Sequence, residues 1–263
     1  MAMSSGARIN TPIAAYNALN ALNAVNQELG VHQLRLATGK RINSVGDDPS
    51  GYTIAKQMEA RSRMLGAAVN NIGDAQTMLS TAEQALQTIR DLFTTIKEKG
   101  VASSNPTSDQ NALTSDVNQL RTEIGDIVAN TNFNGKNLFS SSYSAAIAID
   151  DVGNSLTVGF DASTATFGSV SSLTNIQSSI SSNISNVETA LQAIGSYIQR
   201  LQAKADNLNV SITNIDASRS RIYDADIAKE QLQASKLNIL QQTSVTQLAQ
   251  ANASSQVFLT LFR

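Results

Sequence analysis

The chain has 263 residues, a net charge of −2, 41% hydrophobic residues, no cysteine and one histidine. These totals exclude a disulfide framework and a thiolate metal site, and the scattered cations form no basic patch of the kind that binds nucleic acid or anionic lipid. Since His32 is the single histidine, a His-based catalytic triad or a multi-histidine metal site cannot form within one subunit. We therefore expect neither an enzyme nor a cofactor or metal site, and neither nucleic acid nor a membrane as partner.

The first segment in chain order, residues 9–27, contains no charged residue and no histidine, and residues 237–262 at the other end share this composition. Both segments are rich in Asn, Gln, Ser and Thr, and apolar residues recur in them at helical spacing. Exposed helices usually owe their solubility to charged side chains, so we expect these helices to be buried against other copies of the chain. The residues expected to carry this assembly are Leu19, Leu22, Val25, Leu29, Leu237, Leu240, Leu248 and Phe258.

A turn is predicted after the first helix, at residues 39–48, and a long helix after it. Asp48 is expected to be the N-cap, with Pro49 at the first helical position. The Asp47–Asp48 pair lacks the further ligands or opposed acid of a catalytic or metal site, so the cap interpretation is preferred. Two rows of apolar residues then predict a coiled-coil seam over a helix of about residues 49–99. The rows are Met58, Leu65, Ile72, Leu79, Leu86 and Phe93, and Ile54, Ala68, Ala75, Ala82, Ile89 and Ile96.

The middle of the chain predicts a turn, a second helix and a small β-element. Asn105-Pro106 repeats the cap-then-proline signal ahead of a helix that carries its apolar residues over 113–127 and folds back on the first helix. Asn134-Gly135 ends this pattern, and residues 143–149 and 155–160 alternate apolar and polar residues, which predicts a β-hairpin.

A third long helix and a last helix complete the predicted elements. The longest apolar seam runs over residues 184–215 in steps of three and four, with Leu173, Ile176 and Ile180 leading into it. After it, Asp224 and Asp226 are interpreted as turn and cap residues, with Asp226 opening a helix at Ile227.

Four sequence blocks resemble the bacterial flagellin family, in the family's order and spacing. Residues 36–58 read LATGKRINSVGDDPSGYTIAKQM and resemble the N-terminal signature of flagellin. Residues 133–139 (FNGKNLF), 220–230 (SRIYDADIAKE) and 239–252 (ILQQTSVTQLAQAN) resemble its conserved turn, C-terminal turn and last helix. The conserved-looking turn and cap residues in these blocks are Arg41, Asn43, Asp47, Asp48, Asp224 and Asp226.

The resemblance implies a mainly α fold that serves as a filament subunit. It implies a long antiparallel helical rod or coiled-coil bundle with a small β-hairpin, and N- and C-terminal helices that pair. Residues 1–45 and 220–263 correspond to the terminal helices of the inner filament layer. Residues 46–219 correspond to the rod, with the hairpin at about 140–165. Only about residues 140–172 separate the conserved halves, so the chain resembles a minimal flagellin without large outer domains.

The resemblance also implies a route and partners. The chain is expected to leave the cell unfolded through the flagellar type III apparatus and to polymerise at the distal tip of an extracellular filament. A C-terminal export chaperone and a filament cap are implied partners, besides other copies of the chain. Innate receptors of animals recognise some flagellins through the region that matches Leu86, Arg90 and Leu92. Thr88 stands where the family motif has Arg, which weakens the case for such recognition.

Two other functions are weighed against the flagellin interpretation. A junction protein between hook and filament shares the terminal pattern but is present in few copies. A secreted helical adhesin or effector would use its ends to bind a host membrane or a partner helix. Amphipathic helices that bind membranes usually carry Lys and Arg on their polar face, and the two charge-free ends have none.

Overall fold

A computed structural model describes residues 13–139, 144–150, 154–159, 173 and 176–261, and the side chains of these residues except 254–261. The described chain divides into two compact units, which we call the terminal unit (residues 1–59 and 215–263) and the central unit (residues 60–214). The fold is mainly helical with small antiparallel hairpins, as predicted. The helices are α1 (Ile13–Thr38), α2 (Pro49–Ala102), α3 (Gln110–Asn130), α4 (Ile176–Tyr223) and α5 (Ile227–Leu261).

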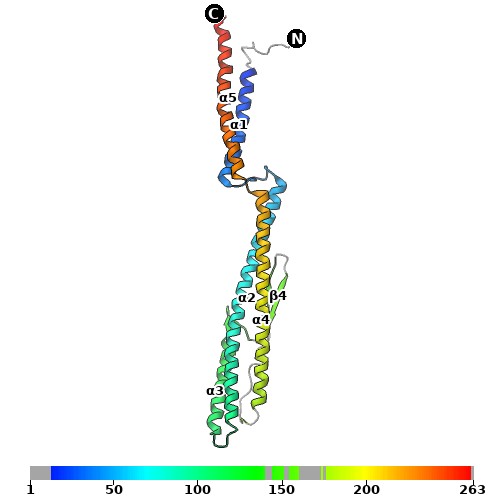
Figure 1. Cartoon of the computed structure of the whole chain (residues 1–263), viewed down its shortest axis with the longest axis vertical. Coiled ribbons are helices and arrows are strands. Elements are labelled where there is room, and N and C mark those ends of the chain that lie inside the picture. The colour runs from blue at the N-terminus through cyan, green and yellow to red at the C-terminus, as the bar shows by residue number, and fades with distance from the viewer. Residues whose placement is uncertain (1–12, 140–143, 151–153, 160–172, 174–175, 262–263) are drawn as a thin grey trace. The chain divides into compact units, whose positions relative to one another are not determined.

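The terminal unit is built on the pairing of α1 with α5, as predicted for the two chain ends. The helices lie side by side and run in opposite directions, so that the start of α1 and the end of α5 lie at the same end of the pair (Figure 1). The start of α2 and the end of α4 belong to the same unit. Between α1 and α2 the chain turns through Gly39, whose φ of +68° suits glycine at the end of a helix.

In the central unit, α2 buries the seam that its heptad spacing predicts. The first row is buried from Leu65 to Phe93, and the second from Ala68 to Ile96. The prediction was wrong at the start of the second row, because Ile54 is 40% exposed while its neighbour Ala55 is 2% exposed. Residues 54 and 55 belong to the terminal unit, where the face of α2 that carries Ala55 also carries Gly51, which lies against Ile42.

Helix α3 begins later than predicted, because a different residue caps it. The N-cap is Asp109, whose Oδ1 accepts hydrogen bonds from the backbone N–H groups of Asn111 and Ala112 at 3.0 and 3.1 Å. Asn105 instead accepts from the backbone N–H of Thr107, two residues on, which closes a turn. The Asn105-Pro106 pair therefore lies in the connection between α2 and α3, and the prediction that it opens the helix was wrong.

Two short hairpins follow α3 in the central unit. In the first, β1 (Asn132–Phe133) pairs with β2 (Lys136–Asn137) around Asn134-Gly135, whose φ angles of +49° and +75° give a two-residue turn with both φ values positive. In the second, β3 (Ser144–Ala148) pairs antiparallel with β4 (Ser155–Gly159), which confirms the predicted β-hairpin. The other residues of the predicted hairpin region, 140–143, 151–153 and 160–165, lie outside the described residues.

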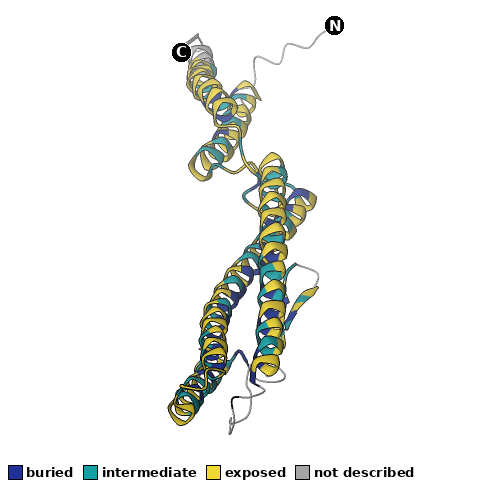
Figure 2. Cartoon of the chain, turned by 60° about the horizontal axis from the view of Figure 1, so that its bottom comes forward, coloured by how far each residue is buried: buried dark blue, intermediate teal, exposed yellow. Residues whose placement is uncertain are grey.

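Helix α4 supplies the third seam. Residues seven apart on α4 are buried from Ile180 to Leu208, while those of the alternate row, such as Leu191 and Ile198, are half-buried. Because α4 begins at Ile176, the seam continues through Ile180 as expected. In the central unit the buried residues gather between the helices and the exposed residues cover the outside (Figure 2).

Candidate functional site at the chain termini

The paired terminal helices share only a small apolar core. Its buried residues are Leu29, Ala234 and Leu237, and Val25 and Leu36 are packed against them half-buried. Helices α1 and α5 are 26 and 35 residues long, so this core covers a minor part of their surface. Among the side chains that the structure describes, many other residues of α1 and α5 are exposed and accessible to contacts outside the chain.

Helix α1 carries two apolar stripes on opposite sides. At 100° per residue, Ala15, Leu22 and Leu29 share the side that packs on α5. The opposite side carries large apolar residues that are 42–59% exposed. These are Ile13, Tyr16, Val31 and Leu34. One stripe thus pairs within the chain and the other is free.

Helix α5 is two-sided in the same way. Leu237 and Leu248 lie three turns apart on the side that faces α1, and Leu248 is half-buried. On the opposite side, Leu232 and Ile239 lie seven residues apart and are 64% and 65% exposed, the largest exposures among the large hydrophobic residues that the structure describes. Large exposed apolar side chains that recur every two turns on one face are typical of a helix that binds a partner.

Amide side chains contribute a polar contact between the two helices. Nε2 of Gln241 donates a hydrogen bond to Oδ1 of Asn26 at 2.7 Å, across 215 residues of sequence. Both side chains are neutral, so the pairing avoids the cost of desolvating a charge. This contact is one use of the amides that replace charged residues at the chain ends.

One charged cluster lies where the end of α1 meets the start of α5, and it was not predicted. Glu230 of α5 is the buried charged residue of the described chain, at 8% exposure. Its Oε2 contacts Nδ1 of His32, and its Oε1 lies 3.7 Å from Nη1 of Arg35, both on α1. The signal was available, because Glu230 is the single acidic residue of α5, and His32 and Arg35 are the only basic side chains of α1.

Hydrogen bonds join the turn that follows α1 to the end of α4, and we call this region the junction. The Arg41 side chain donates two hydrogen bonds to the carbonyl oxygen of Ile222, at 3.1 Å from Nε and 2.6 Å from Nη2. The backbone N–H of Arg41 donates to the carbonyl oxygen of Tyr223 at 2.8 Å. The backbone N–H of Ala225 donates to the Gly39 carbonyl at 2.9 Å. Arg41 therefore covers carbonyl groups at the end of α4 that have no partner within the helix.

The turn before α2 is organised by its two aspartates. The Asp47 carboxylate accepts from the backbone N–H groups of Asn43 and Ser44, and these bonds hold the pKa of Asp47 below its ordinary value of 3.8. Asp48 caps α2 by accepting from the backbone N–H of Gly51 at 2.9 Å, as predicted. Both carboxylates thus serve the turn and the helix start.

The remaining predicted site residues fall in different surroundings. Asp226 caps α5 by accepting hydrogen bonds from the backbone N–H groups of Ala228 and Lys229, as predicted. Asp224 pairs with Lys40 through the backbone, in an isolated antiparallel β-bridge. Leu19 and Leu240 are each 40% exposed. The side chain of Phe258 lies outside the described part of the chain.

The region predicted to match the receptor-recognised segment lies on α2 in the central unit. Leu86 is completely buried in the seam, Leu92 is half-buried and Arg90 is exposed. The Arg90 guanidinium donates to Asp91 Oδ1 at 2.8 Å. Of these three residues, Arg90 therefore offers the most accessible side chain.

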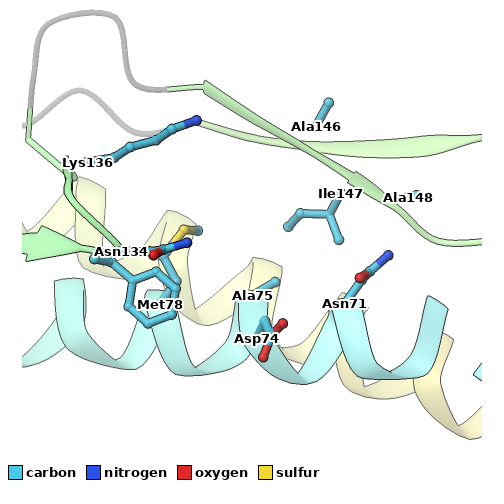
Figure 3. A pocket seen from close by; sticks show the side chains of 10 residues that line it. Asn71, Asp74, Ala75, Met78, Asn134, Lys136, Ala146, Ile147 and Ala148 are labelled. Atoms are coloured by element: carbon cyan, nitrogen blue, oxygen red, sulfur yellow. The ribbon is translucent and has the colours of Figure 1, made fainter. Parts of the chain in front are cut away.

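A groove of the central unit lies between α2 and the two hairpins (Figure 3). Ile147 of β3 points from its strand toward α2, while Ala146 points away, as alternation in a strand requires. The groove holds about 400 Å³ and its charged lining residues are Asp74 and Lys136. This lining has no nucleophile beside a base, so it gives no catalytic arrangement.

Two kinds of feature are missing from the residues that the structure describes. In this part of the chain, no cluster of three or more His, Cys, Asp or Glu side chains could hold a metal ion. Within the same residues, none of the helices combines the length and the apolar character needed to cross a membrane.

Comparisons with known proteins match both halves of the chain. The family models for the bacterial flagellin N-terminal and C-terminal helical regions match residues 9–144 and 177–262. The chain is 28% identical to flagellin FlaB1 of Treponema pallidum, over 97% of this chain and 99% of the relative. It is 30% identical to the flagellin of Bacillus subtilis, over 97% of this chain and 100% of the relative. A crystal structure of Bacillus cereus flagellin is 23% identical, covers 56% of this chain and 88% of that chain, and has a TM-score of 0.41.

Proposed function

The chain belongs to the bacterial flagellin family and is a structural subunit of the flagellar filament, and on this premise we propose that its paired terminal helices form the inner layer of that filament. Residues 1–45 and 220–263 would make this layer, and residues 46–219 the rod around it. The observation that carries the proposal is the second, exposed apolar stripe on each terminal helix.

The exposed apolar stripes of α1 and α5 need a contact that forms again with each subunit that is added. Burying one leucine or isoleucine side chain contributes roughly 1.5 to 3 kcal/mol. Leu232 and Ile239 on α5, and Val31 and Leu34 on α1, are large enough for several such contacts with neighbouring subunits. In a filament one surface patch meets a different patch on the next copy, so growth does not close on itself.

The amide-rich composition fits a layer that is repeated many times. An unpaired charge buried between subunits would cost several kcal/mol in every copy. Asn and Gln can instead bond between helices, as Gln241 does with Asn26, or line a wet central channel.

The proposal also covers how the subunit reaches the filament. The chain would be exported unfolded through the flagellar type III apparatus, with a chaperone on its C-terminal region, and would be added beneath a filament cap outside the cell. Its terminal helices would become ordered when neighbouring subunits bury them, because isolated helices with little packing are marginal in water. It would act without catalysis, as a structural element of motility.

The test is a charge placed on the free stripe. Ile239→Asp should stop filament growth, because it puts a carboxylate into the contact between subunits, while the circular dichroism of the monomer stays unchanged. The matched control is Asn238→Asp, one residue away, where the native side chain is polar and exposed. Leu248→Asp should also block growth, by disrupting the side of α5 that faces α1.

Electron microscopy of purified protein under polymerising conditions gives the result. Long filaments from the wild-type chain and from Asn238→Asp, with none from Ile239→Asp, are expected. Normal filaments from Ile239→Asp would show that the free stripe is not part of the inner contact. Globular particles alone from the wild-type chain would contradict the whole proposal and would leave a junction protein or an adhesin to consider.

A further inference from the structure

We propose that neighbouring copies in the filament also bind each other through their central units, where one face of α3 docks into a groove beside α4 of the next copy. This contact rests on the proposed function, because it adds an outer contact to the same filament. The two surfaces are called the α3 patch and the α4 groove. The patch is formed by Asp116, Gln119, Leu120 and Glu123, and the groove by Ile149, Leu156, Arg200, Ala203, Lys204 and Asn207.

The α4 groove combines apolar side chains with positive charge. It holds about 320 Å³ between α4 and the end of the β3–β4 hairpin, where Ile149 and Leu156 are half-buried. Arg200 and Lys204 lie one turn apart on α4, and the described residues that line the groove include no acidic side chain. The Arg200 guanidinium lies 5.8 Å from the centre of the Tyr197 ring, a contact that leaves its charge uncompensated. Neither cation forms an ion pair with another residue in the described part of the chain.

The α3 patch carries the complementary set of side chains. Asp116, Leu120 and Glu123 share one face of α3, because they are spaced four and three residues apart. Lys99 of α2 neutralises Asp116, with Nζ 2.7 Å from Oδ2. Glu123 and Asp126, at the edge of the same face, are exposed and pair with no cation among the residues that the structure describes. The patch therefore presents a leucine beside two uncompensated carboxylates.

The two surfaces match in charge and in apolar character. Leu120 would pack on the hairpin residues of the α4 groove, while the two carboxylates would meet the two cations. The carboxylates are three residues apart on α3 and the cations four residues apart on α4, so the two pairs span about 4.5 and 6 Å along their helices. Opposite charges around an apolar centre give specificity and fast association. Another copy is the natural occupant, because every subunit brings both surfaces.

The two surfaces lie at different heights along the central unit, so they cannot meet within one copy. Helix α3 runs beside α2, and the β3–β4 hairpin lies beside α4 (Figure 1). The Lys99–Asp116 ion pair places the α3 patch level with about residue 95 of α2, and the Gln76–Gln202 hydrogen bond places the α4 groove level with about residue 74. At 1.5 Å per residue, this separation is about 30 Å. The contact therefore joins different patches of two copies that are displaced by about this distance along the helices.

Disulfide trapping can test the contact directly, because the chain contains no cysteine. Filaments are assembled from a mixture of full-length Gln119→Cys and Ala203→Cys chains, which keep all four charges. The matched control replaces Ala203→Cys by Ser185→Cys, an exposed position on the same face of α4 about five turns away. After oxidation, a disulfide-linked dimer is expected on a denaturing gel from filaments of the first mixture, and none from the control mixture or from monomers. Failure to trap the first mixture in filaments would overturn the contact.

Charge reversal tests the electrostatic match. Arg200→Glu with Lys204→Glu should slow filament growth about tenfold, because like charges would then face each other, and Glu123→Lys with Asp126→Lys should do the same. All four substitutions together should restore growth to within about threefold of the wild type, because opposite charges again face each other. Light scattering measures growth, and circular dichroism of each monomer checks that the variant is folded.

The outcomes separate this contact from the inner layer. Growth of the fourfold variant that is no faster than that of either reversed pair would overturn the docking of the α3 patch in the α4 groove. Unchanged growth of both reversed pairs would also overturn it, and would leave the proposed function intact. Absence of wild-type filaments under every polymerising condition would contradict the proposed function itself.

Discussion

The central and terminal units are both made of long helices, yet they bury their side chains to different degrees. In the central unit, Leu79, Leu86 and Phe93 are completely buried, one after another along the same row of α2. In the terminal unit, Leu237 is buried while Leu232 and Ile239 on the same helix are about two-thirds exposed. The central unit therefore buries its apolar rows within the chain, whereas the terminal unit leaves large apolar side chains of α1 and α5 exposed.

The largest expected difference between the two units comes from replacing one leucine by alanine in each of them. Leu86→Ala should destabilise the monomer by about 3 to 5 kcal/mol, because it leaves a cavity in a completely buried seam. Leu232→Ala should change the stability of the monomer by at most about 0.5 kcal/mol, because the side chain is exposed, and should slow filament growth. Denaturant unfolding of the monomer measures both. Equal losses would mean that the two units are stabilised alike.

A second prediction concerns the junction, where the terminal unit is tightly packed. A Cβ on Gly51 would lie 2.8 Å from Cδ1 of Ile42 and even closer to the Asp48 carboxylate. Gly51→Ala should therefore destabilise filaments by about 1 to 3 kcal/mol, measured by thermal melting. Gly30→Ala is the matched control, because nothing lies within 4 Å of its added methyl group and alanine favours the helix. If Gly51→Ala did not change the melting of the filaments, the side chains of Ile42 and Asp48 would be able to shift and make room for the methyl group.

Helix caps allow a third, smaller comparison between the units. Asp109 caps α3 in the central unit and Asp226 caps α5 in the terminal unit, each by accepting from two backbone N–H groups. Replacing either by Ala should cost about 1 kcal/mol. The loss for Asp109→Ala should appear in the melting of the monomer, and that for Asp226→Ala only in the melting of filaments. A monomer that is equally sensitive to both would show that α5 is already ordered before assembly.

The smallest effect is expected at the exposed turn of the terminal unit. Two backbone hydrogen bonds lower the pKa of Asp47 from 3.8, so the charged form is favoured in the folded turn. The resulting stabilisation is present above the ordinary value and is lost as the pH falls through the lowered value. An NMR titration of the Asp47 carboxyl group should place its pKa below 3.8, and Asp47→Asn should lack the dependence. A measured pKa at or above 3.8 would contradict the two hydrogen bonds that the Asp47 carboxylate accepts in this turn.

Local signals predicted most of the elements correctly, and the errors have local causes too. Asp48 with Pro49 and Asp226 with Ile227 were recognised as helix starts, because capping depends on neighbouring residues alone. Asn105-Pro106 carries the same signal but forms a turn, because Asp109 four residues later competes for the helix start. Heptad spacing placed the seams, but it could not show that α2 turns Ala55 rather than Ile54 inward where it meets Ile42.

At the candidate site, the sequence predicted that the charge-free ends form helices and that these helices need partners. It did not separate residues that pair within the chain, such as Leu29 and Leu237, from those left free, such as Leu232 and Ile239. A spacing of 3.6 residues per turn reports that apolar residues share a face, but not which partner covers that face.

Composition and periodicity by themselves determined the long aliphatic seams, the helix caps at Asp48 and Asp226, the β-hairpin formed by residues 144–148 and 155–159, and the absence of charge from the ends, because each depends on residues close in sequence. Only the tertiary structure decided which stripe of each terminal helix is paired, that Arg41 binds the end of α4, and that Glu230 meets His32 across 198 residues. Such contacts depend on how segments far apart in sequence pack together. That packing is set by the burial available to the whole chain and not by any single segment.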